Sequence, residues 1–96
     1  MYTVEIDELV FSEDFRRIDK TGQRQIIKAV RKKLAEQPSA YGKRLADPFK
    51  GFWKLRVGRY RVIYQIIESR VAVYVVKAGY RRDREVYEEL ARRLKL

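Results

Sequence analysis

The spacing of apolar residues over the first 22 positions predicts a strand followed by a helix. Residues 2–6 are rich in β-branched and aromatic side chains, as short strands are, and Asp7 is a candidate N-cap for the next segment. Phe11, Phe15 and Ile18 then recur at positions i, i+4 and i+7. That spacing places three large side chains on one face of a helix.

A second amphipathic helix is predicted from residue 23 to about residue 36. Its apolar residues recur every three or four positions: Ile26, Ile27, Val30 and Leu34. Gly22 is expected to end the first helix or to separate it from the second, and Pro38 stops the second. Basic residues occupy much of the remaining helix surface, Lys32 and Lys33 among them.

From residue 52 the pattern changes to alternation, which predicts a sheet. Residues 52–57 and 60–67 flank Gly58–Arg59, and a two-residue loop with glycine first suits a type II′ β-hairpin. The loop fixes the register, with Val57 opposite Tyr60. This register assigns seven side chains to a core face: Trp53, Leu55, Val57, Tyr60, Val62, Tyr64 and Ile66.

A third strand and a closing helix complete the predicted order of elements. The strand spans residues 70–78 after a two-residue turn at Glu68–Ser69, and it adds Val71, Val73 and Val75 to the core face. The helix runs from residue 84 to residue 94 and carries apolar residues on one face: Val86, Leu90 and Leu94. The order β-α-α-β-β-β-α predicts a single α+β domain over residues 1–96, with a mostly antiparallel sheet packed against helices.

The composition excludes several classes of site. The chain has no cysteine and no histidine, which removes thiolate and imidazole metal ligands and every Ser-His or Cys-His catalytic arrangement. Only carboxylate sites of the kind that binds Mg²⁺ or Ca²⁺ would remain. Because the sequence has no carboxylate cluster of the nuclease type, we expect no metal and no cofactor. No apolar run approaches the length of a membrane span and the first residues lack the pattern of a signal peptide. We expect a soluble, cytoplasmic protein with no membrane partner.

The charge is the first positive indication of a partner. The chain has 23 Lys and Arg residues against 13 Asp and Glu residues, a net charge of +10. Residues 50–96 hold 13 of these basic residues and 5 of the acidic ones. Polyanions are therefore the expected partner class, although basic residues that only solvate the surface would give the same count.

The hairpin face opposite the core is basic. It carries Lys54, Arg56 and Arg61, and no acidic residue on these strands offsets the opposed pair Arg56 and Arg61. Lys50 is in phase with this face if the strand begins early, and the loop after the third strand directs Arg81 toward it. The pattern predicts a site for a phosphodiester, with tyrosines nearby for stacking against bases.

RNA offers a reaction that such a site can catalyse without a metal. Its 2′-hydroxyl attacks the adjacent phosphate when a base removes the proton, an acid protonates the leaving 5′-oxygen and cations neutralise the transition state. Lysine and tyrosine are the available proton carriers, and the arginines supply the cations. Such a site is expected to need its substrate held in place by something else.

The chain resembles the RelE/ParE superfamily of bacterial and archaeal toxins over two segments, LRVGRYRVIYQI and VYVVKAGYRRDREVYEEL. The resemblance follows the element order of the whole chain and is strongest in the RelE branch. It implies a RelE-like fold and a type II toxin that cleaves mRNA in the ribosomal A site. It also implies three partners: the ribosome, mRNA and an acidic, RelB-like antitoxin. This antitoxin would form a hetero-oligomer with the chain, covering the basic face or displacing the closing helix.

The resemblance further implies roles for four residues. Arg61 and Arg81 would hold the scissile phosphate and stabilise transition-state charge. Tyr87 would stack on or orient the nucleotide, and either Tyr87 or Lys54 would accept the 2′-hydroxyl proton. The RelE branch often has a second lysine two residues before the first, where this chain has Phe52, so the identity of the base stays open.

Six other basic residues are expected to bind ribosomal or messenger RNA: Lys32, Lys33, Lys50, Arg56, Arg82 and Arg84. Two alternative functions stay open. ParE-type toxins, which poison DNA gyrase through protein binding, share the hairpin segment, and a non-catalytic nucleic-acid-binding domain could share the fold. The presence of both Lys54 and Tyr87 in phase favours RNA cleavage.

Overall fold

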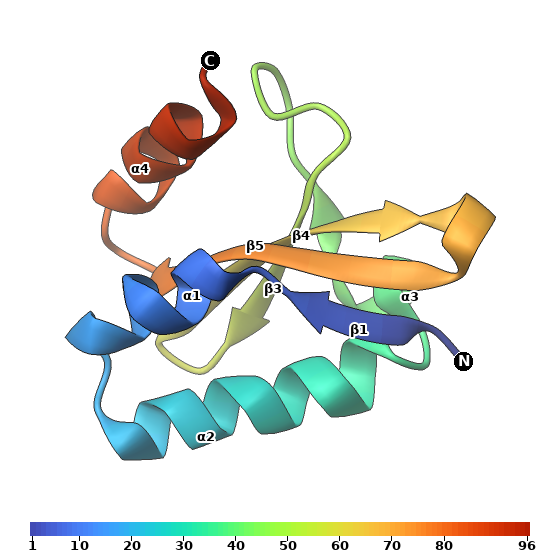
Figure 1. The fold of residues 1–96 in the computed structure, drawn as a ribbon, viewed down its shortest axis with the longest axis horizontal. Coiled ribbons are helices and arrows are strands. Elements are labelled where there is room, and N and C mark those ends of the chain that lie inside the picture. Colours follow the sequence, from blue (N-terminus) through green and yellow to red (C-terminus); the bar gives the residue numbers. More distant parts are fainter.

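Five strands form one mixed sheet, in the order β1-β5-β4-β3-β2, in the computed structural model, which describes all 96 residues (Figure 1). The strands are β1 (Thr3–Ile6), β2 (Lys43–Arg44), β3 (Trp53–Val57), β4 (Tyr60–Ile67) and β5 (Ala72–Tyr80). Only β1 and β5 pair in parallel, and the other pairings are antiparallel. The predicted α+β class and mostly antiparallel sheet are confirmed.

Helical segments cover both faces of the sheet. They are α1 (Glu8–Ser12), the 3₁₀ segment η1 (Asp14–Arg17), α2 (Lys20–Ala29), the π-helical segment η2 (Val30–Leu34), α3 (Pro38–Tyr41), the 3₁₀ turn η3 (Glu68–Arg70) and α4 (Glu85–Leu94). α2 runs along one face of the sheet, and α4 lies on the opposite face (Figure 1). No helix here combines the length and apolar character that a bilayer crossing requires.

The first predicted helix is broken in two. Asp7 caps α1 as expected, since its carboxylate accepts a hydrogen bond from the backbone N–H of Leu9 at 2.8 Å. The α-helix stops one turn later, and η1 follows as a separate 3₁₀ segment. Phe11 therefore does not lie on one helical face with Phe15 and Ile18. It is 48% exposed, whereas Phe15 and Ile18 are buried.

Gly22 lies inside α2, which begins at Lys20, so the expectation that it ends or separates helices is wrong. The carboxylate of Asp19 accepts a hydrogen bond from the Gly22 N–H at 2.8 Å and caps the helix. Packing requires the glycine, because a Cβ at this position would lie 2.1 Å from the Tyr60 hydroxyl oxygen. The glycine that was expected to break a helix is needed instead for a close contact between α2 and Tyr60.

The hairpin of β3 and β4 has the predicted register. The five expected cross-strand pairs, from Val57–Tyr60 to Trp53–Tyr64, are all present. Gly58 has φ of 56° and the next residue has negative φ, as a type II′ turn requires. The turn therefore fixes which side chains share each face of the sheet.

The turn before β5 is longer than the predicted two residues. η3 occupies Glu68–Arg70 and Val71 has a left-handed backbone, with φ of 48° and ψ of 51°, so the strand begins at Ala72. Val71 is 49% exposed, and its assignment to the core face is wrong. Val73 and Val75 are buried as predicted. A β-bulge then shifts the register of the second half of β5.

Two apolar clusters join the layers, one on each face of the sheet. The larger packs the sheet against α1, η1, α2 and η2 and includes Val10, Phe15, Ile26, Val30, Leu34, Leu55, Val62, Tyr64 and Val75. The smaller lies under α4 and consists of Phe49, Ile63, Val76, Val86 and Leu90. Trp53 and Ile66, assigned to the core, are only half-buried at the edge of the larger cluster.

The segment before β3, expected to be a loop, contains α3 and β2. The buried Tyr64 hydroxyl donates a hydrogen bond to the carbonyl of Pro38 at 2.5 Å, and burial raises the pKa of Tyr64 to about 12. A Cβ on Gly42 would lie 1.8 Å from the same hydroxyl oxygen, so any other residue there would displace this contact. β2 then pairs with β3, which fixes residues 41–44 beside the hairpin.

Candidate functional site

A pocket of about 280 Å³ gathers five cationic side chains and one tyrosine. Its lining residues are Tyr41, Lys43, Lys54, Arg56, Arg61 and Arg81. They come from α3, β2, β3, β4 and the loop after β5, so the pocket depends on the register of the whole sheet. The structure thus brings together Lys54, Arg61 and Arg81, three of the four residues expected to be catalytic.

The sheet register explains why the cations converge. Arg56 lies directly opposite Arg61, and Lys43 lies directly opposite Lys54. No carboxylate lines the pocket, and none of its five cations takes part in an ion pair. Each directly opposed like-charge pair costs a sheet up to about 1 kcal/mol. A bound anion would offset this repulsion, so the pocket favours anionic ligands.

The loop after β5 is fastened to the hairpin turn. The backbone N–H of Arg81 donates to the carbonyl of Arg59 at 2.9 Å, and its guanidinium donates to the carbonyl of Gly58 at 3.1 Å. Desolvation and the nearby charge of Arg56 lower the pKa of Arg81. The guanidinium has no carboxylate partner, which leaves donors for an oxyanion.

Tyr87 lies beside the pocket, on α4, rather than in its lining. The guanidinium carbon of Arg61 is 5.2 Å from the centre of the Tyr87 ring. The centres of the Phe49 and Tyr87 rings are 5.7 Å apart. α4 comes this close because Gly79 leaves room for it, since a Cβ there would lie 2.5 Å from Val86 Cγ2. The fourth expected catalytic residue therefore contacts one of the other three.

A buried ion-pair network fastens α4, and with it Tyr87, to the rest of the fold. Lys77 donates to the Asp14 carboxylate at 2.5 Å, and Arg93 of α4 donates two hydrogen bonds to that carboxylate at 2.6 and 3.0 Å. Lys77 also lies 3.4 Å from Glu89 of α4. The side chains of Asp14 and Lys77 are 1% and 3% exposed. Sequence reasoning missed this network, although a lysine within an apolar strand was a signal for it.

Five of the six other residues expected to bind RNA lie outside the pocket lining, and only Arg56 belongs to it. Lys50 is in the loop between β2 and β3 and borders another hollow with Arg44 and Trp53. It does not continue the basic face of β3, because that strand begins only at Trp53. Arg82 and Arg84 are exposed beyond the end of β5.

The last two of these residues, Lys32 and Lys33, are also outside the pocket lining. They line a shallow hollow together with Arg56 and Gly58.

Asp83, which lies between Arg82 and Arg84 in the sequence, forms no ion pair with either of them. Its carboxylate instead accepts a hydrogen bond from a backbone N–H in the first turn of α4 at 2.9 Å.

Two pocket residues, Tyr41 and Lys43, were not predicted from the sequence. Their segment has no apolar period, so it was expected to be a loop with no fixed place. The pairing of β2 with β3 brings them to the pocket. The available signal was a tyrosine followed closely by two basic residues, in the stretch YGKR.

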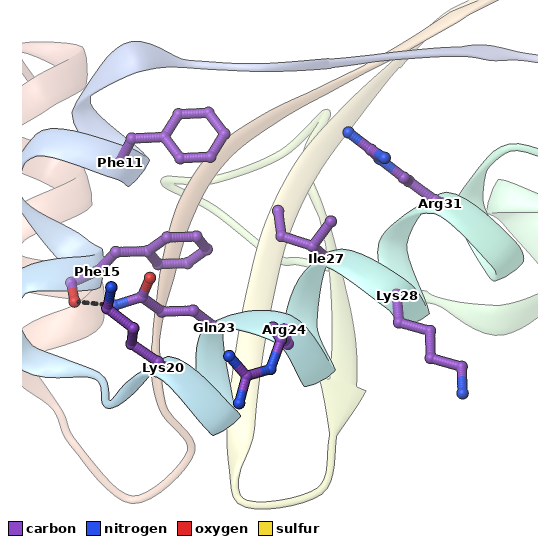
Figure 2. Close-up of a pocket in the computed structure, with 8 residues that line it drawn as sticks. All are labelled: Phe11, Phe15, Lys20, Gln23, Arg24, Ile27, Lys28 and Arg31. Atoms are coloured by element: carbon purple, nitrogen blue, oxygen red, sulfur yellow. Dashed lines mark hydrogen bonds between the residues drawn. The ribbon is translucent and has the colours of Figure 1, made fainter.

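A groove of about 500 Å³ lies between the α1–η1 segment and α2 (Figure 2). Phe11, Phe15 and Ile27 form its apolar part, and the two aromatic rings extend toward Ile27 in Figure 2. Its remaining lining residues are polar or basic: Lys20, Gln23, Arg24, Lys28 and Arg31. This groove shares no residue with the cationic pocket.

Known proteins are similar to this chain in sequence and in fold. A family model described as ParE toxin of type II toxin–antitoxin system, parDE, matches residues 9–85. The mRNA interferase toxin RelE of Escherichia coli (strain K12) is 33% identical over 97% of each chain. The structure of the isolated E. coli RelE toxin superposes with a TM-score of 0.68 at 27% identity, covering 98% of this chain and 99% of that chain.

A complex is also among the structural relatives. The toxin chain in the intact E. coli RelBE toxin–antitoxin complex matches with a TM-score of 0.63 at 25% identity, covering 86% of this chain and 100% of that one. The family match, the relative at 33% identity and the shared fold agree with one another. The chain belongs to the RelE/ParE superfamily of type II toxins.

Proposed function

We propose that this toxin is a ribosome-dependent mRNA endonuclease that cleaves mRNA in the A site by metal-free transesterification. The observation that carries the proposal is the convergence of Lys54, Arg61 and Arg81 in one pocket without a carboxylate, beside Tyr87. The similarity to an mRNA interferase of E. coli supports the same reaction class.

In the proposed reaction the 2′-oxygen attacks the phosphorus and the bond to the 5′-oxygen breaks. The products are a 2′,3′-cyclic phosphate and a free 5′-hydroxyl. Lys54 or Tyr87 accepts the 2′-hydroxyl proton, and the leaving 5′-oxygen takes a proton from the other of these residues or from water. Arg61 and Arg81 donate to the non-bridging oxygens and neutralise the charge that develops on them.

The ribosome supplies what this pocket lacks. Lysine and tyrosine are ordinarily poor general bases at neutral pH, because their unperturbed pKa values are about 10. Holding the mRNA so that its 2′-oxygen is in line with the phosphorus raises the effective concentration of the nucleophile by orders of magnitude. The free protein is therefore expected to cleave RNA slowly and the ribosome-bound protein quickly.

Single-turnover cleavage of mRNA on programmed ribosomes, at the Mg²⁺ concentration that the ribosomes themselves need, tests the proposal. Arg61→Ala and Arg81→Ala should each slow single-turnover cleavage by about 10²- to 10³-fold, the effect of removing one donor to a developing oxyanion. Tyr87→Phe should slow it as well, because it removes a proton carrier. Arg16→Ala is the control, since Arg16 is exposed and outside the pocket. Undiminished cleavage by all three site variants would refute the assignment.

We further propose an acidic antitoxin as the regulatory partner, which would form a hetero-oligomer with the toxin. The structural relative from E. coli was solved as a toxin–antitoxin complex. The groove between α1 and α2 suits an acidic amphipathic helix, because its apolar floor is rimmed by four cations and no carboxylate. Reversing two of these charges, as Lys20→Glu with Arg24→Glu, should weaken the complex without slowing cleavage.

A gyrase poison is the second candidate, favoured by the match to the ParE family model. Assays of supercoiling with purified gyrase separate the two functions. Loss of supercoiling without mRNA cleavage would favour the gyrase target, whereas cleavage with retained supercoiling would favour the RNA target. Salt-sensitive RNA binding without either effect would indicate a non-catalytic nucleic-acid-binding domain.

A further inference from the structure

Tyr41 is the only aromatic side chain in the lining of the cationic pocket. It is 51% exposed, so about half of this side chain is open to solvent. The ammonium of Lys33 lies 5.6 Å from the centre of its ring. An exposed ring beside cations that bind phosphate is the arrangement that proteins use to stack a base of single-stranded nucleic acid.

We propose that Tyr41 and Lys43 form a nucleobase subsite next to the phosphate-binding arginines, with Tyr41 stacking on a base and Lys43 binding the adjoining phosphate. The inference rests on the proposed function for the nature of the ligand, a single-stranded RNA. It assigns a role to a segment that neither the composition nor the periodicity of the sequence singled out.

The backbone on either side of Tyr41 is held in place by contacts with the sheet. The Tyr64 hydroxyl donates to the carbonyl of Pro38 at 2.5 Å, which fixes the start of the short α3 helix. Gly42, which follows Tyr41 in the sequence, has no side chain and so lets the backbone pass close to the Tyr64 hydroxyl. Lys43 is then paired with Lys54 in the sheet. Because this backbone is already fixed, stacking of a base on Tyr41 needs no ordering of the segment, and only the side chain loses conformational entropy.

The two aromatic residues near the pocket lie on different sides of it. Tyr41 precedes β2 at one edge of the sheet, whereas Tyr87 contacts Arg61, which is on β4. The strand between them, β3, carries two of the pocket cations, Lys54 and Arg56. One phosphate at these cations would therefore have an aromatic ring available for the base on either side. The smallest ligand that uses the whole site is a dinucleotide.

Stacking of this kind selects for the presence of a base and not for its identity, because every base has an aromatic face. The expected contribution of Tyr41 is to affinity and position rather than to codon choice. Lys43 contributes only charge, so its effect should not depend on whether a base is present.

Binding of an uncleavable oligonucleotide to the isolated protein tests the subsite. The probe is a tetranucleotide labelled with a fluorophore at its 5′ end, whose first three sugars are 2′-deoxy so that no linkage has a neighbouring 2′-hydroxyl. It is compared with the same oligomer lacking both central bases. Tyr41→Ala should weaken binding of the first by about tenfold, within the range for one base stacked on one ring. It should leave binding of the abasic oligomer unchanged within about twofold. Tyr41→Phe should bind both as the unmodified protein does.

Two further variants separate stacking from other effects. Lys43→Gln should weaken binding of both oligomers equally, because the phosphates are retained in each. Tyr2→Ala is the matched control, since Tyr2 precedes β1 at the opposite edge of the sheet and should change neither affinity. Equal losses for both oligomers in Tyr41→Ala, or no loss for either, would overturn the proposal.

The assay contains no ribosome and no cleavage step, so its outcome is independent of the proposed activity. If the variants behave as expected but the protein cuts no mRNA on ribosomes, the subsite stands and the endonuclease proposal fails. If ribosomal cleavage depends on Arg61 and Arg81 while Tyr41→Ala binds both oligomers normally, the endonuclease stands and the subsite fails.

Discussion

Val71 holds a backbone conformation that β-branched residues rarely adopt. Its φ of 48° and ψ of 51° place it in the left-handed region, where a Cβ branch is crowded by the backbone. Its side chain is 49% exposed, so little apolar burial offsets the strain. We expect Val71→Asn to raise the free energy of unfolding by about 1 kcal/mol, because asparagine tolerates this conformation. Urea denaturation monitored by circular dichroism measures the change.

Val71→Thr is the matched control for this prediction. Threonine keeps the β-branch and the approximate shape of valine while adding polarity, so it should leave stability within about 0.5 kcal/mol. If threonine and asparagine stabilise the protein equally, the gain comes from replacing an exposed apolar group. The backbone conformation would then not be the cause.

Asp7 links the end of β1 to β5 through a charged hydrogen bond. The hydroxyl of Tyr74 donates to its carboxylate, and this bond, together with the one from the Leu9 N–H, lowers the pKa of Asp7 despite its partial burial. A carboxyl group whose pKa is lower in the folded state than in the unfolded state stabilises the protein. For Asp7 this stabilisation is present at pH values above the unfolded-state pKa of 3.8. That stabilisation is lost as the pH falls through the folded pKa.

Asp7→Asn tests this linkage while preserving a side chain that can cap α1. The variant should be less stable than the unmodified protein by about 1 kcal/mol at pH 7, the difference between charged and neutral hydrogen bonds. The two free energies of unfolding should converge as the pH falls below 3.8 and through the lowered pKa of Asp7 in the folded protein, because the carboxylate is then protonated. A difference that stays constant over this range would show that the charge is not responsible.

At the scale of elements, the sequence predicted those parts whose pattern is local. The alternation around Gly58 gave the hairpin and its register because a two-residue turn leaves one pairing that buries the apolar face. The failures arose from long-range contacts. Gly22 was expected to break a helix. That expectation failed because the residue packs against Tyr60, nearly forty positions away, and no local pattern shows this contact. Likewise, α3 and β2 depend on the distant Tyr64 hydroxyl.

The candidate site divides in the same way. Arg61 could be placed opposite Arg56 by counting from the turn, and the loop after β5 brought Arg81 to the same end of the sheet. Tyr41 and Lys43 reach the pocket only through a two-residue strand, which no periodicity can show. The polar network under α4 was equally hidden, because its members come from three separate elements.

The position of α4 depends on Asp14, which is almost completely buried and accepts hydrogen bonds from Lys77, Arg93 and the Ala78 N–H. Asp14→Ala would leave a buried ammonium with only the more distant Glu89 and would free Arg93 from its main partner. We expect it to lower the free energy of unfolding by about 3–5 kcal/mol, as removal of one partner from a buried ion pair does. Thermal and urea denaturation measure this loss.

An exposed carboxylate provides the comparison for Asp14. Glu36 follows η2, is exposed and forms no ion pair, so Glu36→Ala should change stability by less than about 0.5 kcal/mol. A similarly small loss for Asp14→Ala would mean that the apolar cluster of Val86 and Leu90 alone holds α4.

For the whole molecule, the question is whether RNA binding depends on the net charge of +10 or on where the charges lie. Single-stranded nucleic acid releases counterions when its phosphates are neutralised, so log K falls with log salt by about 0.7 per phosphate contact. If the pocket contacts the RNA backbone, Arg56→Ala should make this slope shallower by about 0.7. Arg16→Ala removes the same charge from η1, outside the pocket, and should leave the slope unchanged. Titrating a labelled single-stranded RNA at several salt concentrations gives both slopes. Equal slopes for the two variants would mean that the overall field of the protein, and not this pocket, binds the RNA.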